Sequence, residues 1–133
     1  MTSIKEAIKF HGHLGPYLIL GIIAGRLSLK KLGCKKYFGL NVKVYGANIK
    51  PKSCLIDGLQ LSTGATYGKG NINKYTADKI KIIVFNLGNN KRIQLSLKKS
   101  ITEKLDSLRS HFESEEFAKK LLKIKRQDIF DLK

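Results

Sequence analysis

Cysteine is scarce in this chain of 133 residues, which contains only Cys34 and Cys54. Two cysteines cannot build a disulfide framework or a four-cysteine zinc module. Long apolar runs are also lacking, since the longest, from Tyr17 to Ala24, is far shorter than the roughly 20 residues that cross a bilayer. The first residues have no apolar core of a secretory signal, so we expect a protein of the reducing cytoplasm with both thiols free.

Acidic residues are scarce as well. Aspartate and glutamate total 10 against 26 lysines and arginines, which gives a formal net charge of +16. This imbalance favours anionic partners such as nucleic acid or an anionic small molecule. A lysine-rich surface is also typical of proteins adapted to heat. No nucleic-acid-binding motif is present, and the aromatic residues, at 8%, do not interleave with basic ones along the sequence.

The hydrophobic pattern predicts a single α+β domain over residues 1–133. Gly88-Asn89-Asn90 is typical of a hairpin turn, and the tail at 128–132 is expected to dock as a short final element. Gly21 and Gly25 lie one turn apart in a predicted helix and leave a flat strip where another backbone can approach. The predicted helices are 3–10, 16–32, 54–63, 101–112 and 115–125, the strands are 40–45, 80–87 and 92–97, and a loop covers 65–75.

Two histidines flank a glycine after the first predicted helix, in the segment His11-Gly12-His13-Leu14-Gly15. The glycines and Pro16 argue against a helix here, and in an extended segment residues two apart share a face. Two imidazoles on one face can converge on a metal ion, and imidazole is a common zinc ligand. The alternative is that both side chains only cap or bridge a turn.

Cys54 and Asp57 lie three residues apart at the start of the predicted helix 54–63, so their side chains share a face. The helix dipole at this end is expected to favour the thiolate of Cys54, which suits a metal ligand or a nucleophile. The alternative is a small buried cysteine and an aspartate that caps the helix.

A glycine-rich loop from Thr63 to Asn71 follows this helix. It offers small side chains, backbone amides and Lys69, as anion-binding loops do. It is not a Walker A loop, since only three residues separate Gly64 from Gly68 and a glycine follows the lysine. The sequence leaves open a simple anion-binding loop or a tight connection that needs glycine backbone angles.

Together these segments resemble the N-terminal domain of the FmdE-type family, whose name is that of one component of formylmethanofuran dehydrogenase. The resemblance covers nearly the whole chain. In chain order, it is carried by Phe10-His11-Gly12-His13 with Pro16 and Gly21, by Ser53-Cys54 with Asp57 and Gln60, by the run from Thr63 to Asn71, and by Gln127-Asp128-Ile129-Phe130.

The resemblance implies a thioredoxin-like core, with a mixed β-sheet flanked by helices, in a protein that forms homodimers. It also implies a cleft that holds zinc or a small anion, and a link to a molybdenum or tungsten enzyme that handles formylmethanofuran. The implied metal ligands are His11, His13, Cys54 and Asp57, and the implied ligand-binding residues are Gln60, Thr63, Thr66, Lys69 and Asn71.

The chain departs from the family pattern at two cleft positions. The family has cysteine where Gly15 and Ala65 stand here, so a redox role through a cysteine pair is not expected. No cysteine follows Cys54, so the zinc finger that ends many members is not expected either. The remaining imidazole, thiolate and carboxylate groups still suit zinc, and three protein ligands plus water form an open site that can activate water.

The leading hypothesis is therefore an FmdE-like accessory or ligand-binding protein. A zinc-dependent enzyme of unknown substrate and a basic nucleic-acid-binding protein are the alternatives. Loss of metal or anion binding on replacement of His13 or Cys54 would favour the cleft. Nucleic-acid binding that weakens steeply with salt would favour the last alternative.

Overall fold

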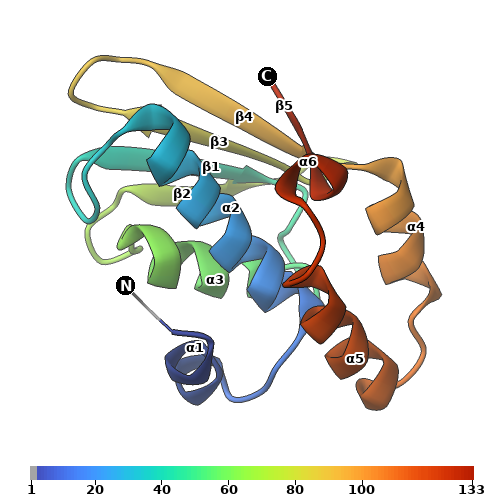
Figure 1. Ribbon diagram of the computed structural model, residues 1–133. Helices are drawn as coiled ribbons and strands as arrows, with labels where there is room; N and C mark the ends of the chain where they lie inside the picture. The colour runs from blue at the N-terminus through green and yellow to red at the C-terminus, as the bar shows by residue number, and fades with distance from the viewer. Residues whose placement is uncertain (1–2) are drawn as a thin grey trace.

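The computed structural model describes residues 3–133 and shows a five-stranded mixed β-sheet with helices on one face and around one end (Figure 1). The strand order across the sheet is β2-β1-β3-β4-β5. The α+β class and the mixed sheet with helices are confirmed, whereas the thioredoxin-like core stays a prediction. The elements are α1 (Ile4–His11), α2 (Pro16–Leu32), β1 (Leu40–Tyr45), α3 (Cys54–Thr63), β2 (Ile72–Tyr75), β3 (Lys81–Asn86), β4 (Arg92–Leu97), α4 (Lys99–Ser107), α5 (His111–Leu121), α6 (Arg126–Ile129) and β5 (Phe130–Leu132).

The sheet is antiparallel except at one edge, where β2 runs parallel to β1. Successive side chains of a strand point to opposite faces. In β1, Leu40, Val42 and Val44 are fully buried, and the residues between them are only partly buried. One face of the sheet therefore forms the core with α2 and α3, and the other face is turned outward (Figure 1).

Helix α2 begins and ends where the sequence predicts. Proline suits the first helical position because it needs no amide partner there, and Gly33 ends the helix in the left-handed conformation (φ 62°). Every residue from Pro16 to Gly25 is buried, which places this helix at the centre of the core. Although α2 is apolar, no helix within residues 3–133 is long and apolar enough to cross a membrane.

The contact between α2 and α3 depends on glycine in both helices. A Cβ atom added to Gly21 would lie 2.9 Å from the Cα of Gly58 and would collide with the carbonyl oxygen of Leu55. One turn further on, Gly25 faces Ser62, whose hydroxyl donates to the carbonyl of Gly58 (2.8 Å). The glycine strip predicted for α2 is therefore used inside the chain, where it lets two helix backbones touch.

Strand β2 is missing from the sequence prediction, which has a loop at 65–75. Only Ile72 among its four residues is buried, so the segment has no apolar alternation to indicate a strand. It forms because β1 offers an edge for pairing, with Ile72 opposite Val42. Tertiary contact, rather than local pattern, makes this strand.

The C-terminal helices differ in extent from the prediction of one helix over 101–112 and another over 115–125. Helix α4 ends at Ser107, and Ser110 begins a new helix because its hydroxyl accepts a hydrogen bond from the amide of Glu113 (3.1 Å). Phe112 therefore belongs to α5, not to α4. The tail docks as α6 and the edge strand β5, and β3 and β4 form the predicted hairpin.

Alanine at Gly21 or Gly58 would force the α2 and α3 backbones apart. Overpacking of this kind costs about 1–3 kcal/mol or more, because backbone atoms cannot move aside as a flexible side chain can. We expect both variants to unfold at clearly lower urea concentration than the parent. Gly68→Ala is the matched control, since a Cβ there would lie 3.8 Å from the nearest atom, and it should change the free energy of unfolding by less than about 0.5 kcal/mol. Equal effects of all three substitutions would contradict the proposed packing.

Candidate functional site

A histidine and an aspartate join the first and third helices. His11 is the last residue of α1, which ends at Gly12 in a left-handed conformation (φ 107°). The Nδ1 atom of His11 lies 2.6 Å from Oδ2 of Asp57, in the first turn of α3. The side chain of His11 is 9% exposed and that of Asp57 is 35% exposed. The carboxylate predicted as a metal ligand is thus engaged with the imidazole.

This pair determines which nitrogen of His11 remains available. With Nδ1–H donated to the carboxylate, the lone pair lies on Nε2. That atom is buried and has no hydrogen-bond partner among residues 3–133. A carboxylate that holds one imidazole nitrogen while the other is free is the usual support for a metal ligand or a general base. His11 therefore has the geometry of a reactive or ligating group.

His13 lies beside His11, although His11 belongs to a helix and not to an extended segment as predicted. The ring centroids are 4.8 Å apart, and the ring planes are tilted by 38°. Burial lowers the pKa of His13 below its ordinary value of 6.5, and the positive charges of His11 and His111 lower it further. Neutral imidazole, the form that binds a metal ion or accepts a proton, is therefore favoured near pH 7.

A pocket of about 220 Å³ opens beside His13. Its wall combines the first turns of α2, α3 and α5 with one side of α4. The lining residues are His13, Leu14, Gly15, Pro16, Tyr17, Pro51, Cys54, Leu105, Leu108, His111 and Ser114. The N-terminal end of a helix carries partial positive charge, so the convergence of these ends favours an anionic group.

His111 and Ser114 are candidates that the sequence analysis missed. Both lie at the start of α5, far from His13 in the chain, and both line the pocket. The chain has only three histidines, and His11 and His111 both affect the pKa of His13. The rarity of histidine was the signal that could have drawn attention to His111.

Cys54 lies on the pocket wall, but its thiolate is not favoured as predicted. Burial raises the pKa of Cys54 above its ordinary value of 9.0, the Asp57 carboxylate raises it further, and Lys50 opposes this only in part. The first amides of α3 also donate to the carbonyls of residues 51–53, at 3.0–3.1 Å, which leaves fewer free donors at this helix end. The predicted activation is therefore wrong, and Cys54 is a neutral thiol near pH 7.

The loop after α3 uses polar side chains to stabilise its own fold. Thr63 is fully buried, and its hydroxyl donates to the carbonyl of Leu59 (2.6 Å). Asn71 accepts a hydrogen bond from the amide of Thr66 (3.0 Å), and Gln60 accepts one from a later loop amide (3.3 Å). These bonds explain the residue types without a ligand.

Lys69 is turned toward aromatic rings and not toward the histidines. Its ammonium lies 5.9 Å from the ring centre of Tyr37 and 5.5 Å from that of Phe38. Of the described residues that line the pocket beside His13, none is among the five predicted ligand-binding residues Gln60, Thr63, Thr66, Lys69 and Asn71. The structure does not bring the predicted anion loop and the histidines into one cleft.

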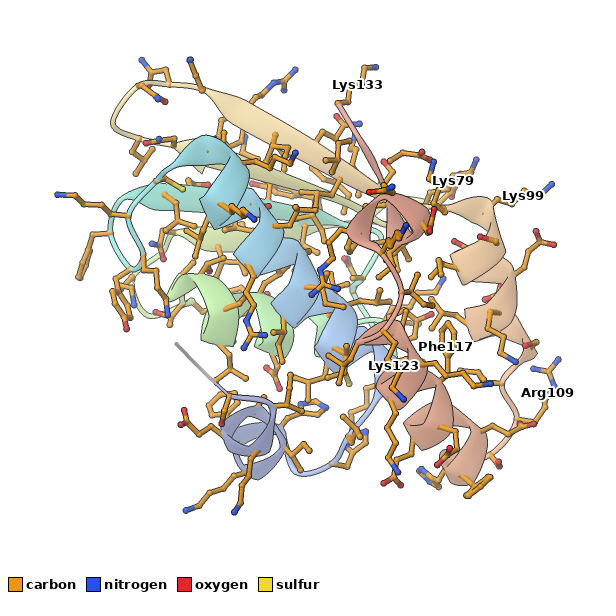
Figure 2. The ribbon with its side chains drawn as sticks, in the orientation of Figure 1. Lys79, Lys99, Arg109, Phe117, Lys123 and Lys133 are labelled. Atoms are coloured by element: carbon orange, nitrogen blue, oxygen red, sulfur yellow. The ribbon has the colours of Figure 1, made fainter. Side chains whose placement is uncertain are left out.

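A larger groove of about 890 Å³ adjoins the pocket, and Tyr17 and Leu105 line both. Lys79 and Lys99 line the groove near the start of α4 (Figure 2). Carboxylates line it too, so the groove has no single sign of charge. Burial, together with the negative charge of Asp106, raises the pKa of Tyr17 to about 12. The Tyr17 hydroxyl therefore stays protonated and can donate a hydrogen bond to a bound group.

Metal ligands are not preassembled at this site. Within residues 3–133, no group of three or more His, Cys, Asp or Glu side chains is placed to hold a metal ion. The Nε2 atom of His11, the imidazole of His13 and the thiol of Cys54 are donor types that zinc accepts, but they do not surround one point. We therefore derive no reaction step through a metal.

Replacing His111 with glutamine should raise the pKa of His13, because it removes one of the positive charges that disfavour protonation. The measurement is an NMR titration of the imidazole signals in metal-free protein. Lys120→Gln, which removes an exposed charge from the same helix, is the control and should leave His13 unchanged. The lowered pKa also means that the folded state loses stability as the pH falls through 6.5. A parent pKa at or above 6.5 would contradict this description of the site.

The sequence and fold also relate the chain to known proteins. It matches the family model described as "FmdE, Molybdenum formylmethanofuran dehydrogenase operon" over residues 10–131. Its fold is similar to that of a tungsten formylmethanofuran dehydrogenase FmdE-like protein from Syntrophus aciditrophicus, with a TM-score of 0.60 and 19% identity, covering 98% of this chain and 68% of that one.

A further relative is a probable S-adenosyl-L-methionine-binding protein from Archaeoglobus fulgidus. It is 33% identical over 70 residues, which cover 52% of this chain, and the chain spans only 19% of that relative. The family match is much broader, since it includes the His-Gly-His segment, the helix that begins at Cys54 and the start of α5. This chain therefore belongs to the FmdE family.

Proposed function

We propose that the chain is an accessory, ligand-binding protein that works in the cytoplasm with a molybdenum or tungsten formylmethanofuran dehydrogenase. The family description and the name of the structural relative support the association with that enzyme. The pocket beside His13 supports a binding role. S-adenosyl-L-methionine binding is not part of the proposal, because the shared segment is 19% of the relative that bears this name.

The observation that carries the proposal is the convergence of helix N-termini and histidines on one pocket. The first turns of α2 and α5 present amides without partners inside their helices. His13 and His111 add imidazole donors or acceptors on the same wall. This combination suits a carboxylate or a similarly small anionic group.

The size of the pocket limits what can enter. At about 220 Å³ it is smaller than most pockets for drug-sized ligands, which hold about 300–1,000 Å³. The pocket therefore accepts a small molecule or one end of a larger one. The adjoining groove, which shares Tyr17 and Leu105, offers room for the remainder of a larger ligand.

A zinc-binding form of this site is the more specific version of the proposal. The buried Nε2 of His11 has no partner, and His13 and Cys54 lie nearby as further donors. When bound, zinc would supply a Lewis acid or an activated water. Gly15 stands where the family has cysteine, and a Cβ there would lie 3.2 Å from Nε2 of His13. The missing cysteine would thus have been next to His13.

Formate is the probe for the anionic pocket, and the histidine NMR signals are the readout. We expect formate to shift the signals of His13 and His111 in a saturable way, beyond the effect of chloride at equal ionic strength. Ser114→Leu places a larger side chain on the pocket wall and should weaken formate binding at least about tenfold, from the loss of access. Ser107→Leu, on the exposed surface of α4, is the matched control.

No saturable shift with formate, or equal binding by the Ser114→Leu and Ser107→Leu variants, would reject the anionic pocket. The resemblance to dimeric relatives also predicts a homodimer, which sedimentation velocity of the same samples measures.

Metal content tests the zinc version separately. We expect near-stoichiometric zinc in the untagged parent by mass spectrometry, loss of zinc in Cys54→Ala and retention in Cys34→Ala, since Cys34 does not line the pocket. A metal-free parent that binds zinc only as the Gly15→Cys variant would show that the glycine disabled the site. In that case the zinc version fails and the anionic pocket stands on its own test.

A further inference from the structure

The outward face of the sheet is a second surface with its own chemistry. All helices formed by residues 3–133 lie on the other face or around the end of the sheet (Figure 1). Strand alternation and register give the residues that point outward. We call them the outer face, and they are Asn73 and Tyr75 of β2, Asn41, Lys43 and Tyr45 of β1, Lys81, Ile83 and Phe85 of β3, and Arg92, Gln94 and Ser96 of β4.

Aromatic rings lie at both ends of the outer face. Tyr45 and Tyr75 are directly opposite each other on neighbouring strands, and their rings stack with centroids 5.0 Å apart and planes 25° apart. Phe85 pairs with Asn41, four residues back along β1 from Tyr45, so it lies about 13 Å away along the strand direction. Tyr75 is 38% exposed, and Tyr45 and Phe85 are partly exposed.

Lysine ammonium groups lie over these rings. The Nζ of Lys81 is 4.7 Å from the ring centre of Tyr45, and the Nζ of Lys43 is 5.3 Å from that of Phe85. Arg92 stands next to Phe85 on the neighbouring strand. The outer face therefore alternates aromatic and basic side chains, a pattern that sequence order does not show because the residues come from four strands.

The charge of the outer face has one sign. Its ionisable side chains, on the described strands β1 to β4, are two lysines, one arginine and two tyrosines, with no carboxylate. The nearest strand carboxylate is that of Asp131 on β5, which pairs with Lys98. The surface is thus complementary to a polyanion, as the net charge of +16 is for the molecule as a whole.

We propose that the outer face binds single-stranded nucleic acid, with bases stacked on the tyrosine pair and on Phe85, and phosphates bound by Lys43, Lys81 and Arg92. Aromatic platforms combined with a cationic surface on an open sheet are what single strands require. The lysines that cover the rings are already placed where a base would displace them toward the phosphates. This activity is separate from the pocket, which lies among the helices.

A second copy of the chain is a less suitable occupant. In a symmetric dimer through this face, Lys43, Lys81 and Arg92 would face their own copies, and such like-charge contacts are unfavourable. An acidic protein would satisfy the charges but not use the stacked rings. Single-stranded nucleic acid uses both features.

Fluorescence polarisation with labelled oligouridine and oligodeoxythymidine, each about 12 nucleotides long, tests the proposal within the usual site size. We expect binding of one or both by the full chain. Tyr75→Ala should weaken it by about fivefold to 100-fold, the effect of removing one stacking platform, and Tyr75→Phe should restore it. Phe112→Ala is the control, because Phe112 is 72% exposed but lies on α5. A preference between the two probes tells whether RNA or DNA is the better ligand.

Salt dependence provides the second readout and does not rely on a ring being removed. Lys43→Gln and Lys81→Gln should each reduce the slope of log K against log salt by about 0.7, the value for one phosphate contact on a single strand. Lys9→Gln, on α1, should leave the slope unchanged.

Three outcomes would overturn the proposal. The first is no binding of either probe by the folded parent. The second is equal weakening by Tyr75→Ala and Phe112→Ala, or by Lys43→Gln and Lys9→Gln, which would mean diffuse attraction to the whole basic surface. The third is sedimentation showing that Tyr75→Ala or Lys43→Gln converts a dimer to a monomer, which would assign the outer face to a second copy.

Discussion

The close contact between α2 and α3 is the constraint on which the rest of the structure depends. Because Gly21 and Gly58 have no side chains, the two helix backbones meet directly, and Ser62 fills the next turn against Gly25. This contact aligns the first turn of α3 with the start of α2. Cys54 and Asp57 are therefore brought to the segment that precedes α2, where both histidines of the His-Gly-His motif lie.

The candidate site is thus assembled from helix ends and not from one loop. Asp57 holds His11, His11 and His111 keep His13 neutral, and α5 closes the pocket opposite Cys54. Each group modifies the proton affinity of its neighbour. Burial and the Asp57 carboxylate oppose ionisation of the Cys54 thiol, so the imidazoles, rather than the sulfur, are the groups ready to bind at neutral pH.

Features set by local sequence were predictable, and features set by distant contacts were not. Pro16 and Gly33 define α2, and alternation defines β1 and the hairpin, because each depends on neighbouring residues only. Strand β2 forms through pairing with β1, and His111 reaches the pocket through the packing of α5, so neither leaves a local pattern. The helix-dipole argument for Cys54 failed because it omitted burial and a neighbouring charge. The family resemblance supplied the ligand residues of the glycine-rich loop, which the structure places apart from the pocket.

The uneven burial of the helices has a consequence for how the molecule opens. Helix α2 is buried over ten successive residues, from Pro16 to Gly25, whereas α4 buries only Ile101 and Leu105. Regions with few buried contacts open locally, while the core exchanges its amide hydrogens only when the whole domain unfolds. The pocket lies where these two regimes meet, with α2 on one side and Leu105 of α4 on the other. A ligand larger than the pocket can therefore enter by fraying of α4 alone, while the glycine-packed helix pair keeps its hydrogen bonds.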